Sequence, residues 1–280
     1  MEYGSGKNIL ITGCSTGIGH CVAQGLKARG WRVFATARKM ADVDKLKKEG
    51  FESCQIDLDN SYSIHSGVQW VLEQSDGRLD ALFNNGAYGQ PGAMEDITRQ
   101  AIREQFETNV FGTHELTSLI LPVMRAQGYG RIIQNSSILG FVAMPFRGAY
   151  VASKFAINGL TEAMRVEMQG SGIDFILIEP GPIRTEFRKN AREAFLKFIK
   201  IDKSPYQEKY QGWIKIATQE EAKKMPFSLP PEAVLEKVIK ALESKTPKTR
   251  YGVTTPTHVF WILRCILPRR WLDKILLKAS

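Results

Sequence analysis

Two side chains that could exchange protons stand four residues apart in the stretch Tyr150-Val-Ala-Ser-Lys154. The residues that follow, from Phe155 to Met168, keep helical apolar spacing without a proline, so the two side chains are predicted to share one helix face. A neighbouring ammonium favours the phenolate, which would lower the tyrosine pKa from a reference value of about 10 and suit Tyr150 to acid–base chemistry. The same spacing is also typical of a snorkelling pair on a helix surface, so other parts of the chain must decide between the two.

A glycine-rich turn near the N-terminus could hold a phosphate. Lys7–Thr12 is a short apolar run typical of a buried parallel strand, and a GxxxGxG turn leads from it into an amphipathic helix. Glycines let the backbone approach a pyrophosphate, and the free N–H groups at a helix start favour its charge. The spacing differs from the usual GxGxxG fingerprint, but strand, turn and helix together predict a dinucleotide cradle. Its residues are Gly13, Ser15, Thr16, Gly17, Ile18 and Gly19.

Basic residues follow the second predicted strand, Trp31–Thr36. Arg38 and Lys39 stand where an acidic residue would bind the ribose hydroxyls of NAD, so they favour a 2′-phosphate and predict NADP(H). Arg38 is the stronger candidate because a guanidinium can contact a phosphate bidentately and stack on adenine; the alternative is a solvated loop charge. Phe51–Ile56 predicts a third strand ending at Asp57, which could meet the adenine amino group or cap a turn or helix.

Strands and helices alternate along most of the chain, which predicts the α/β class: a single-domain, doubly wound parallel sheet, Rossmann-like. Leu79–Phe83, Gly130–Asn135 and Ile173–Ile178 are the fourth, fifth and sixth expected strands. The residues that follow each would lie at the carboxyl edge of the sheet, where ligands bind. In a long helical region over residues 98–126, Asn109 interrupts the pattern and predicts a kink or a water site.

These motifs stand in the order found in the short-chain dehydrogenase/reductase family, which the chain resembles over nearly its whole length. The resemblance rests on TGCSTGIG at 12–19, NNGA at 84–87, Asn109, NSS at 135–137, YVASK at 150–154 and PGPIRT at 180–185. It implies a catalytic tetrad of Asn109, Ser137, Tyr150 and Lys154, with Ser137 preferred to Ser136 because it has the family's spacing to the tyrosine. It also implies that NADPH gives hydride to a carbonyl carbon while Tyr150 protonates the oxygen and Ser137 hydrogen-bonds it.

The resemblance assigns further roles around the cofactor. Lys154 would lower the tyrosine pKa and hold the nicotinamide ribose, Asn109 would position a water, and Thr185 would help to orient the carboxamide. Gly86 and Ala87 stand in the opposite order to the family's NNAG; if the second position needs a positive φ, Ala87 would be strained. The remaining predicted cofactor contacts are Asp57, Leu58, Asn84, Asn85, Gly86, Tyr150, Pro180, Gly181 and Ile183.

From residue 186 to 229 the strand and helix alternation lapses, and aromatic residues alternate with Lys and Arg. This predicts a mobile helical substrate lid over an apolar pocket, the alternative being that the aromatics are ordinary core or subunit contacts. The PGPIRT turn, the PKTRY segment and the tail resemble the branch of bacterial NADP-dependent aldehyde reductases near the 17β-hydroxysteroid and retinol dehydrogenases, which implies lipophilic carbonyl or alcohol substrates. The predicted substrate contacts are Ser137, Phe141, Met144, Phe146 and Phe187.

Residues 230–280 form a C-terminal extension of the single domain 1–280, whose catalytic core is 7–185. Pro231–Ser244 predicts an amphipathic helix and Pro247–Thr254 an edge strand. The tail that follows is too short and too basic to span a bilayer, which takes about 20 apolar residues. It could dock on a membrane surface, pack over the substrate mouth or form a subunit contact.

Composition narrows the remaining function classes. The net charge of +9 is dispersed and accompanies no nucleic-acid motif, so nucleic acid is not an expected partner. The four cysteines lack CxxC spacing and paired histidines, so no metal site or disulfide framework is expected. The polar N-terminus lacks the apolar core of a secretory signal, which predicts a cytoplasmic protein, with the inner membrane surface as a peripheral contact of the tail.

Two expectations concern assembly and activity. The family resemblance implies a homodimer or homotetramer, with contacts through residues 98–126 and 148–170. A non-catalytic NADP-binding regulator on the same fold is the alternative to an enzyme, and a peripheral membrane scaffold is a third reading that depends on the tail alone. The complete tetrad favours the enzyme, because binding alone would not require it.

Overall fold

A computed structural model describes residues 6–218 and 226–279, and its centre is one parallel sheet. The strand order is β2-β1-β3-β4-β5-β6 and all pairs are parallel, so successive strands are added on opposite sides of β1, which leaves a crevice at the carboxyl edge between β1 and β3. The central strands β1, β3 and β4 are short runs that are almost wholly buried, as a sheet covered on both faces requires, whereas the edge strand β6 is partly exposed. They are β1 Asn8–Ile11, β2 Arg32–Ala35, β3 Ala81–Asn84, β4 Gly130–Asn135, β5 Ile173–Glu179 and β6 Arg250–Gly252.

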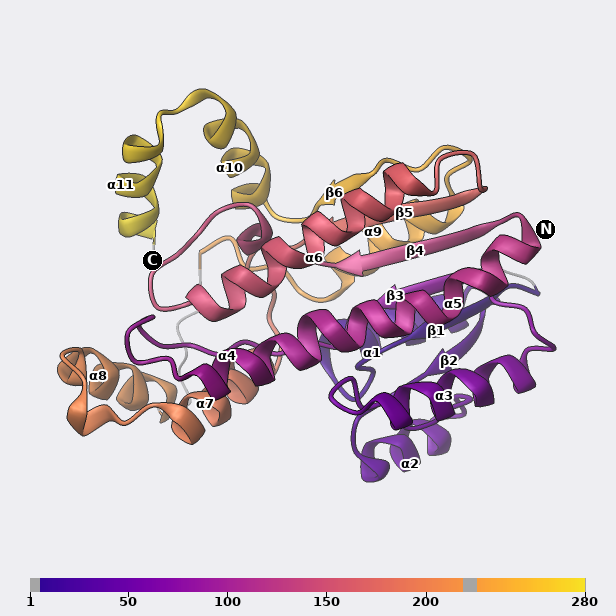
Figure 1. Cartoon of the computed structure of the whole chain (residues 1–280), viewed down its shortest axis with the longest axis horizontal. Helices are drawn as coiled ribbons and strands as arrows, with labels where there is room; N and C mark the ends of the chain where they lie inside the picture. Colours follow the sequence, from indigo (N-terminus) through magenta and orange to yellow (C-terminus); the bar gives the residue numbers. More distant parts are fainter. Residues whose placement is uncertain (1–5, 219–225, 280) are drawn as a thin grey trace.

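Helices cover both faces of this sheet (Figure 1). One apolar cluster joins the strands to α1 (Gly17–Lys27), α2 (Met40–Lys48) and α9 (Glu232–Glu243). A second joins the opposite face to α3 (Ser61–Gln74), α5 (Thr113–Gln127) and α6 (Gly148–Glu167). The predicted doubly wound α/β architecture is therefore confirmed.

The segment expected to form the third strand, Phe51–Ile56, departs from the prediction. Only two isolated bridges, Phe34–Glu52 and Ala37–Gln55, connect it to the outer side of β2. Phe51 and Ile56 are buried in different apolar clusters, so side-chain packing holds the segment although no continuous ladder forms. Residue 57 nevertheless lies at the same edge of the sheet as expected.

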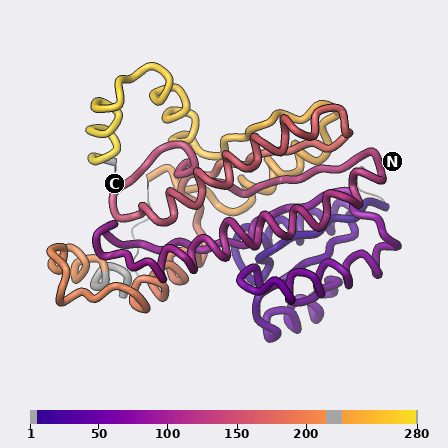
Figure 2. The backbone as a smooth tube through the Cα atoms, in the orientation of Figure 1, coloured from indigo at the N-terminus to yellow at the C-terminus, as the bar shows by residue number. Residues whose placement is uncertain are grey.

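Two helical pairs extend beyond the carboxyl ends of the strands (Figures 1 and 2). They are α7 (Phe187–Phe198) with α8 (Gln207–Thr218), and α10 (Thr255–Ile266) with α11 (Arg269–Ala279). The loop between β4 and α6 packs against both pairs, because Phe141 lies in a cluster with α10 and α11 whereas Phe146 lies in a cluster with α7 and α8. None of the helices in the described part of the chain is long and apolar enough to cross a membrane.

The second half of the chain contains the helix, the edge strand and the helical segment that the sequence predicts. The predicted amphipathic helix is α9, and the predicted edge strand is β6, which pairs in parallel with β5. The predicted lid is helical at α7 and α8, and its residues 219–225 lie outside the described residues. A short α4 (Arg99–Phe106) and a π-helix (Glu107–Gly112) precede α5, in the region expected to be one long helix.

Candidate active site

The glycine-rich turn between β1 and α1 has the shape of an anion cradle. Gly13 and Gly17 have φ of 69° and 61°, a region that favours glycine. A Cβ on Gly19 would lie 2.3 Å from the carbonyl oxygen of Gly13, and one on Gly17 would lie 3.1 Å from Thr185. The Thr16 side chain makes no capping hydrogen bond, and the first turn of α1 has no acidic residue. The start of α1 therefore fits a pyrophosphate. Thr185 lies against Gly17 of this turn, and its role in orienting the carboxamide stays a prediction.

Hydrogen bonds join the carboxyl ends of β1, β3 and β4 beside the cradle. The Thr12 hydroxyl accepts the N–H groups of Asn85 (3.0 Å) and Gly86 (2.9 Å). The Asn85 side-chain amide donates to the carbonyl oxygens of Thr12 (3.0 Å) and Gly13 (3.2 Å) and accepts from Asn135 Nδ2 (2.8 Å). Asn84 differs, because its amide donates to Thr117 Oγ1 on α5 at 2.9 Å. Its side chain therefore holds α5 rather than reaching toward the crevice.

The expected strain at Ala87 is wrong. Neither Gly86 nor Ala87 is among the residues of positive φ in the described part of the chain. Gly86 is needed for space instead: a Cβ there would lie 3.1 Å from Leu58 Cδ1, and a Cβ on Gly13 would lie 2.8 Å from the Gly86 Cα. With glycine before alanine in this chain, Gly86 occupies the position that packs against the cradle.

The residues predicted to bind the adenosine half lie just beyond β2. Arg38 and Lys39 are exposed, and neither belongs to an ion pair between residues that the structure describes. Asp57 Oδ1 accepts the N–H of Asp59 (3.2 Å), which is the turn-capping alternative. Leu58 is buried against Gly86, so the four residues border one end of the crevice.

Tyr150 and Lys154 lie one turn apart on α6, and Lys154 Nζ is 5.6 Å from the centre of the tyrosine ring. Lys154 is only 4% exposed, so the alternative of a surface pair is wrong. Its ammonium donates to the carbonyl oxygen of Asn135 at 2.7 Å, where β4 ends. Burial lowers the pKa of Lys154 to about 8. The two side chains share a face toward the carboxyl edge of the sheet, as predicted.

The expectation that the pKa of Tyr150 lies below its ordinary value is also wrong for the protein without a bound cofactor. Burial raises the pKa of Tyr150 to about 12. The groups that pull it down again are the Ser137 hydroxyl and the Arg147 guanidinium, rather than Lys154. A phenol that keeps its proton is the form that can donate to a carbonyl oxygen, so this environment suits the reduction direction.

The two serines after β4 have separate roles. Ser137 precedes the 3₁₀ turn Ile138–Gly140, and its Oγ accepts the N–H of Leu139 at 3.1 Å. The Ser136 hydroxyl donates its proton to Asn158 Oδ1 at 2.5 Å, on α6. Ser137 is thus the serine beside Tyr150, and Ser136 is structural, as predicted.

Asn109 lies in the π-helix Glu107–Gly112, so the predicted irregularity is present and takes the form of a π-bulge. Its Nδ2 donates to the carbonyl oxygen of Tyr88 (2.9 Å) and to Ser153 Oγ (3.1 Å), and its Oδ1 accepts the N–H of Tyr88 (3.1 Å). The side chain therefore ties the loop after β3 to α6. Its role in holding a water stays a prediction.

The aromatic residues predicted to contact substrate fall into two groups. The Phe187 ring is 5.5 Å from the Tyr150 ring and borders the site directly. Phe141 is buried 6.2 Å from Trp261 of α10, and Phe146 packs edge-to-face 5.1 Å from Trp213 of α8. For these two the alternative of ordinary core contacts describes what the structure shows. Met144 is half-buried in the cluster that includes α10 and α11.

The tail packs against the loop that carries Ser137. This agrees with one of its three expected arrangements, a position over the substrate mouth, which itself stays a prediction. Phe260, Leu272 and Leu276 are buried against Phe141 and neighbouring residues of the loop that carries Ser137. Tyr150 lies at the margin of the same cluster. Exposed apolar side chains remain on the outer sides of α10 and α11, and a membrane or subunit contact through them stays a prediction.

Comparison with known proteins agrees with this geometry. The family model described as short chain dehydrogenase matches residues 7–195. The chain belongs to the short-chain dehydrogenase family. Uncharacterized oxidoreductase YbbO of Escherichia coli is 41% identical over 270 residues, which are 96% of this chain and 94% of that protein. An NADPH-dependent 3-dehydrocapnine reductase of Ornithobacterium rhinotracheale is 30% identical, over 96% of this chain and 95% of the relative. A short-chain dehydrogenase structure from Streptomyces avermitilis superposes with a TM-score of 0.79 at 28% identity, covering 96% of each chain.

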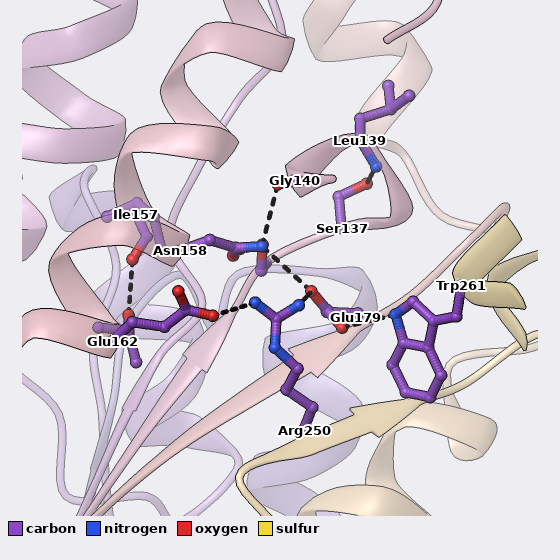
Figure 3. Close-up of polar contacts among 11 residues, drawn as sticks. Ser137, Leu139, Gly140, Ile157, Asn158, Glu162, Glu179, Arg250 and Trp261 are labelled. Atoms are coloured by element: carbon purple, nitrogen blue, oxygen red, sulfur yellow. Dashed lines mark hydrogen bonds and ion pairs between the residues drawn. The ribbon is translucent and has the colours of Figure 1, made fainter. Parts of the chain in front are cut away.

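Sequence reasoning missed a buried polar network of this dehydrogenase (Figure 3). Glu179, at the end of β5, is fully buried. Its Oε1 accepts from Arg250 Nη1 (2.8 Å) and Asn158 Nδ2 (3.1 Å), and its Oε2 accepts from Trp261 Nε1 (3.1 Å). The Asn158 amide also donates to the carbonyl oxygen of Gly140 at 3.0 Å. The network thus ties the Ser137 loop to β6 and α10; the only signal in the sequence is an acidic residue ending an apolar strand.

Burial of Lys154 predicts a pH dependence of stability. The folded-state pKa, about 8, lies below the ordinary 10.5, so between these values the unfolded chain binds the proton more tightly. The contribution of this lysine to the free energy of unfolding therefore rises with pH, by about 1 kcal/mol per pH unit at most. Lys154→Met should lose this gain, which urea denaturation at a series of pH values from 7 to about 10 measures. An exposed control, Lys45→Met, should follow the wild-type curve; parallel curves for all three proteins would contradict the prediction.

Proposed function

We propose that this dehydrogenase is an NADP(H)-dependent oxidoreductase of lipophilic carbonyl compounds and the corresponding alcohols. The observation that carries the proposal is the position of Tyr150. Its phenol lies beside Ser137 and one turn from Lys154, and the anion cradle with Thr185 occupies the same edge of the sheet. A proton donor next to a cradle for a dinucleotide supports carbonyl reduction rather than nucleotide binding alone.

The residues of the chain divide the work of such a reaction. When bound, NADPH supplies the hydride. The Tyr150 hydroxyl donates its proton to the carbonyl oxygen, and Ser137 donates a hydrogen bond to the same oxygen as negative charge develops. Lys154, whose ammonium donates to the Asn135 carbonyl oxygen, places a positive charge near the Tyr150 ring. Asn109 hydrogen-bonds both α6 and the loop after β3, which helps to fix the position of Tyr150 relative to the cradle.

The preference for NADP(H) rests on Arg38 and Lys39, and the similarity to an NADPH-dependent 3-dehydrocapnine reductase supports it. Arg38→Asp should weaken NADPH binding by about 10- to 100-fold, because a charge-assisted phosphate contact is replaced by a repulsive carboxylate, and should leave NADH binding nearly unchanged. Fluorescence titration with both cofactors measures this. Lys45→Asp on the outer side of α2 makes the same charge change away from the crevice and should bind both as wild type does. An unchanged NADPH preference in Arg38→Asp would remove this residue from the argument.

The lipophilic substrate class rests on the apolar side chains around Tyr150. Phe187, Met144 and the α10–α11 cluster border the phenol from different elements. NADPH consumption with aliphatic aldehydes, retinal, steroid ketones and small diketones tests the class. Turnover of long aldehydes or ketones is the expected result. No NADPH consumption with any compound of the panel, together with tight NADPH binding, would favour the alternative of a non-catalytic regulator.

A homodimer is the assembly we propose for this enzyme. Phe111 and Phe155 are 53% and 40% exposed. They belong to neighbouring helices, and an apolar groove between these helices is lined by Phe106, Val110, Phe111, His114, Ala156 and Leu160. A second copy would cover this surface from water, since exposed apolar patches of this kind mark interaction sites. Sedimentation equilibrium of the purified chain measures the assembly directly.

A further inference from the structure

Three arginines lie near the catalytic tyrosine. Arg147 precedes α6, and Arg188 and Arg192 lie in the first half of α7. None of the ion pairs between residues that the structure describes includes any of them. Arg147 and Arg188 are exposed, whereas Arg192 is half-buried and its Nε is a buried donor without a hydrogen-bond partner among the described residues. A buried donor is normally paired, so this group of positive charges has a donor free for a ligand.

The helix geometry of α7 places two of them on one face. Arg188, Arg192, Phe195 and Ile199 follow the spacing of a single helix face. Phe195 and Ile199 are buried in a cluster with Ala149, in the first turn of α6. The half-buried Arg192 and the exposed Arg188 continue this face toward the start of α7, where the preceding residue, Phe187, contacts the Tyr150 ring.

The third arginine is fixed at the mouth of the same site. Arg147 stands one turn before Tyr150, and a backbone bridge to Gly92 holds its position. The preceding Phe146 has a φ of 61° and packs edge-to-face against Tyr206, just before α8, and Trp213 of α8. Arg147 precedes Tyr150 by one helical turn and Arg188 directly follows Phe187, so both arginines flank the contact between the Tyr150 and Phe187 rings. In agreement with this placement, the positive charge of Arg188 lowers the pKa of Arg147, and the charge of Arg147 opposes the rise in the pKa of Tyr150.

The dinucleotide does not account for this charge. The pyrophosphate cradle is at the start of α1, and the basic residues for a 2′-phosphate follow β2. The three arginines instead belong to the lid helix and to the loop before α6, which border the substrate side of Tyr150. An anion there would come with the molecule whose carbonyl group reacts.

We propose that Arg147, Arg188 and Arg192 bind an oxyanion carried by the substrate, a carboxylate, sulfonate or phosphate, so that the preferred substrates are amphiphilic oxo acids. The inference rests on the proposed function and deepens it. A guanidinium pairs bidentately with such groups through charge-assisted hydrogen bonds. The apolar part of the substrate would extend along Phe187 and Met144, away from the arginines.

A pair of probes that differ only in charge tests the inference. For 4-oxodecanoate, the double variant Arg188→Gln/Arg192→Gln should raise KM by about 10- to 100-fold, because charge-assisted hydrogen bonds are lost. For methyl 4-oxodecanoate, KM should change by less than about twofold. Lys189→Gln removes one positive charge from the outer side of the same helix and should leave both values as in the wild type.

Calorimetric binding of the acid and the ester to the NADP⁺-loaded protein, which cannot reduce them, gives a second reading that does not need turnover. Tighter binding of the acid than of the ester, lost in the double variant and in Arg147→Gln, is the expected result. Equal affinity for acid and ester, or an unchanged acid affinity in the variants, would overturn the anion site. Reduction of the ester and of neutral aldehydes would then still support the proposed function, so failures of the two proposals can be told apart.

Discussion

Tyr150→Phe should lower kcat for carbonyl reduction by about 10²- to 10⁴-fold, the range that a positioned general acid contributes. The substitution removes only the hydroxyl and keeps the ring, so the contact with Phe187 and the packing of α6 should remain. NADPH affinity should stay within about twofold, since the cradle lies in the turn before α1. Steady-state kinetics with a long-chain aldehyde, together with fluorescence titration of NADPH, measures both quantities.

The matched control for this variant is Tyr62→Phe. Tyr62 is 83% exposed on α3 and does not belong to the tetrad, so removal of its hydroxyl should leave turnover unchanged. If Tyr150→Phe turned over as fast as the wild type while Tyr62→Phe behaved normally, Tyr150 would not be the proton donor.

Arg250→Met should lower the free energy of unfolding by about 3–5 kcal/mol, because it leaves the buried carboxylate of Glu179 without its cation. Burial already raises the pKa of Glu179, and loss of the guanidinium removes the largest effect opposing that rise. The destabilisation should therefore shrink as the pH falls and Glu179 becomes protonated. Urea denaturation at pH 7 and at pH 5 measures the loss and its direction.

Two further variants serve as controls for the Arg250→Met result. Arg29→Met breaks an exposed pair with Glu243, which should cost no more than about 1 kcal/mol. The double variant Glu179→Gln/Arg250→Met removes the unpaired charge and should recover part of the stability lost in Arg250→Met. A loss in Arg250→Met no larger than that in Arg29→Met would show that the network does not hold β6 and α10 to the sheet.

Much of the fold could be predicted because local patterns agree with the tertiary structure. Apolar runs such as Ile173–Ile178 are typical of buried strands. The glycines at 13, 17 and 19 lie where a Cβ would come too close to the cradle or to Thr185. The spacing of Tyr150 and Lys154 placed both on one face of α6, and the structure confirms it. These features depend on residues near one another in the chain.

The features that were missed depend on distant partners. Phe51–Ile56 has strand-like composition, but its pairing depends on β2, which engages it at only two positions. The pKa of Tyr150 follows from burial by elements far along the chain, and this effect outweighs the cations near it. Glu179 and Arg250 are 71 residues apart, so no local pattern could pair them. The alignment of Arg147 with Arg188 likewise appears only when α7 folds over the loop before α6.

Transfer of a labelled hydride tests the central claim most directly. The protein would be incubated with decanal and NADPH carrying deuterium at both C4 positions of the nicotinamide, and the products analysed by mass spectrometry. The account predicts decanol with one deuterium on the carbinol carbon, formed at a rate that Tyr150→Phe reduces by at least about 10²-fold. NADPH bound tightly with no labelled alcohol, from decanal or from an oxo acid, would contradict it and identify the chain as a nucleotide-binding protein without reductase activity.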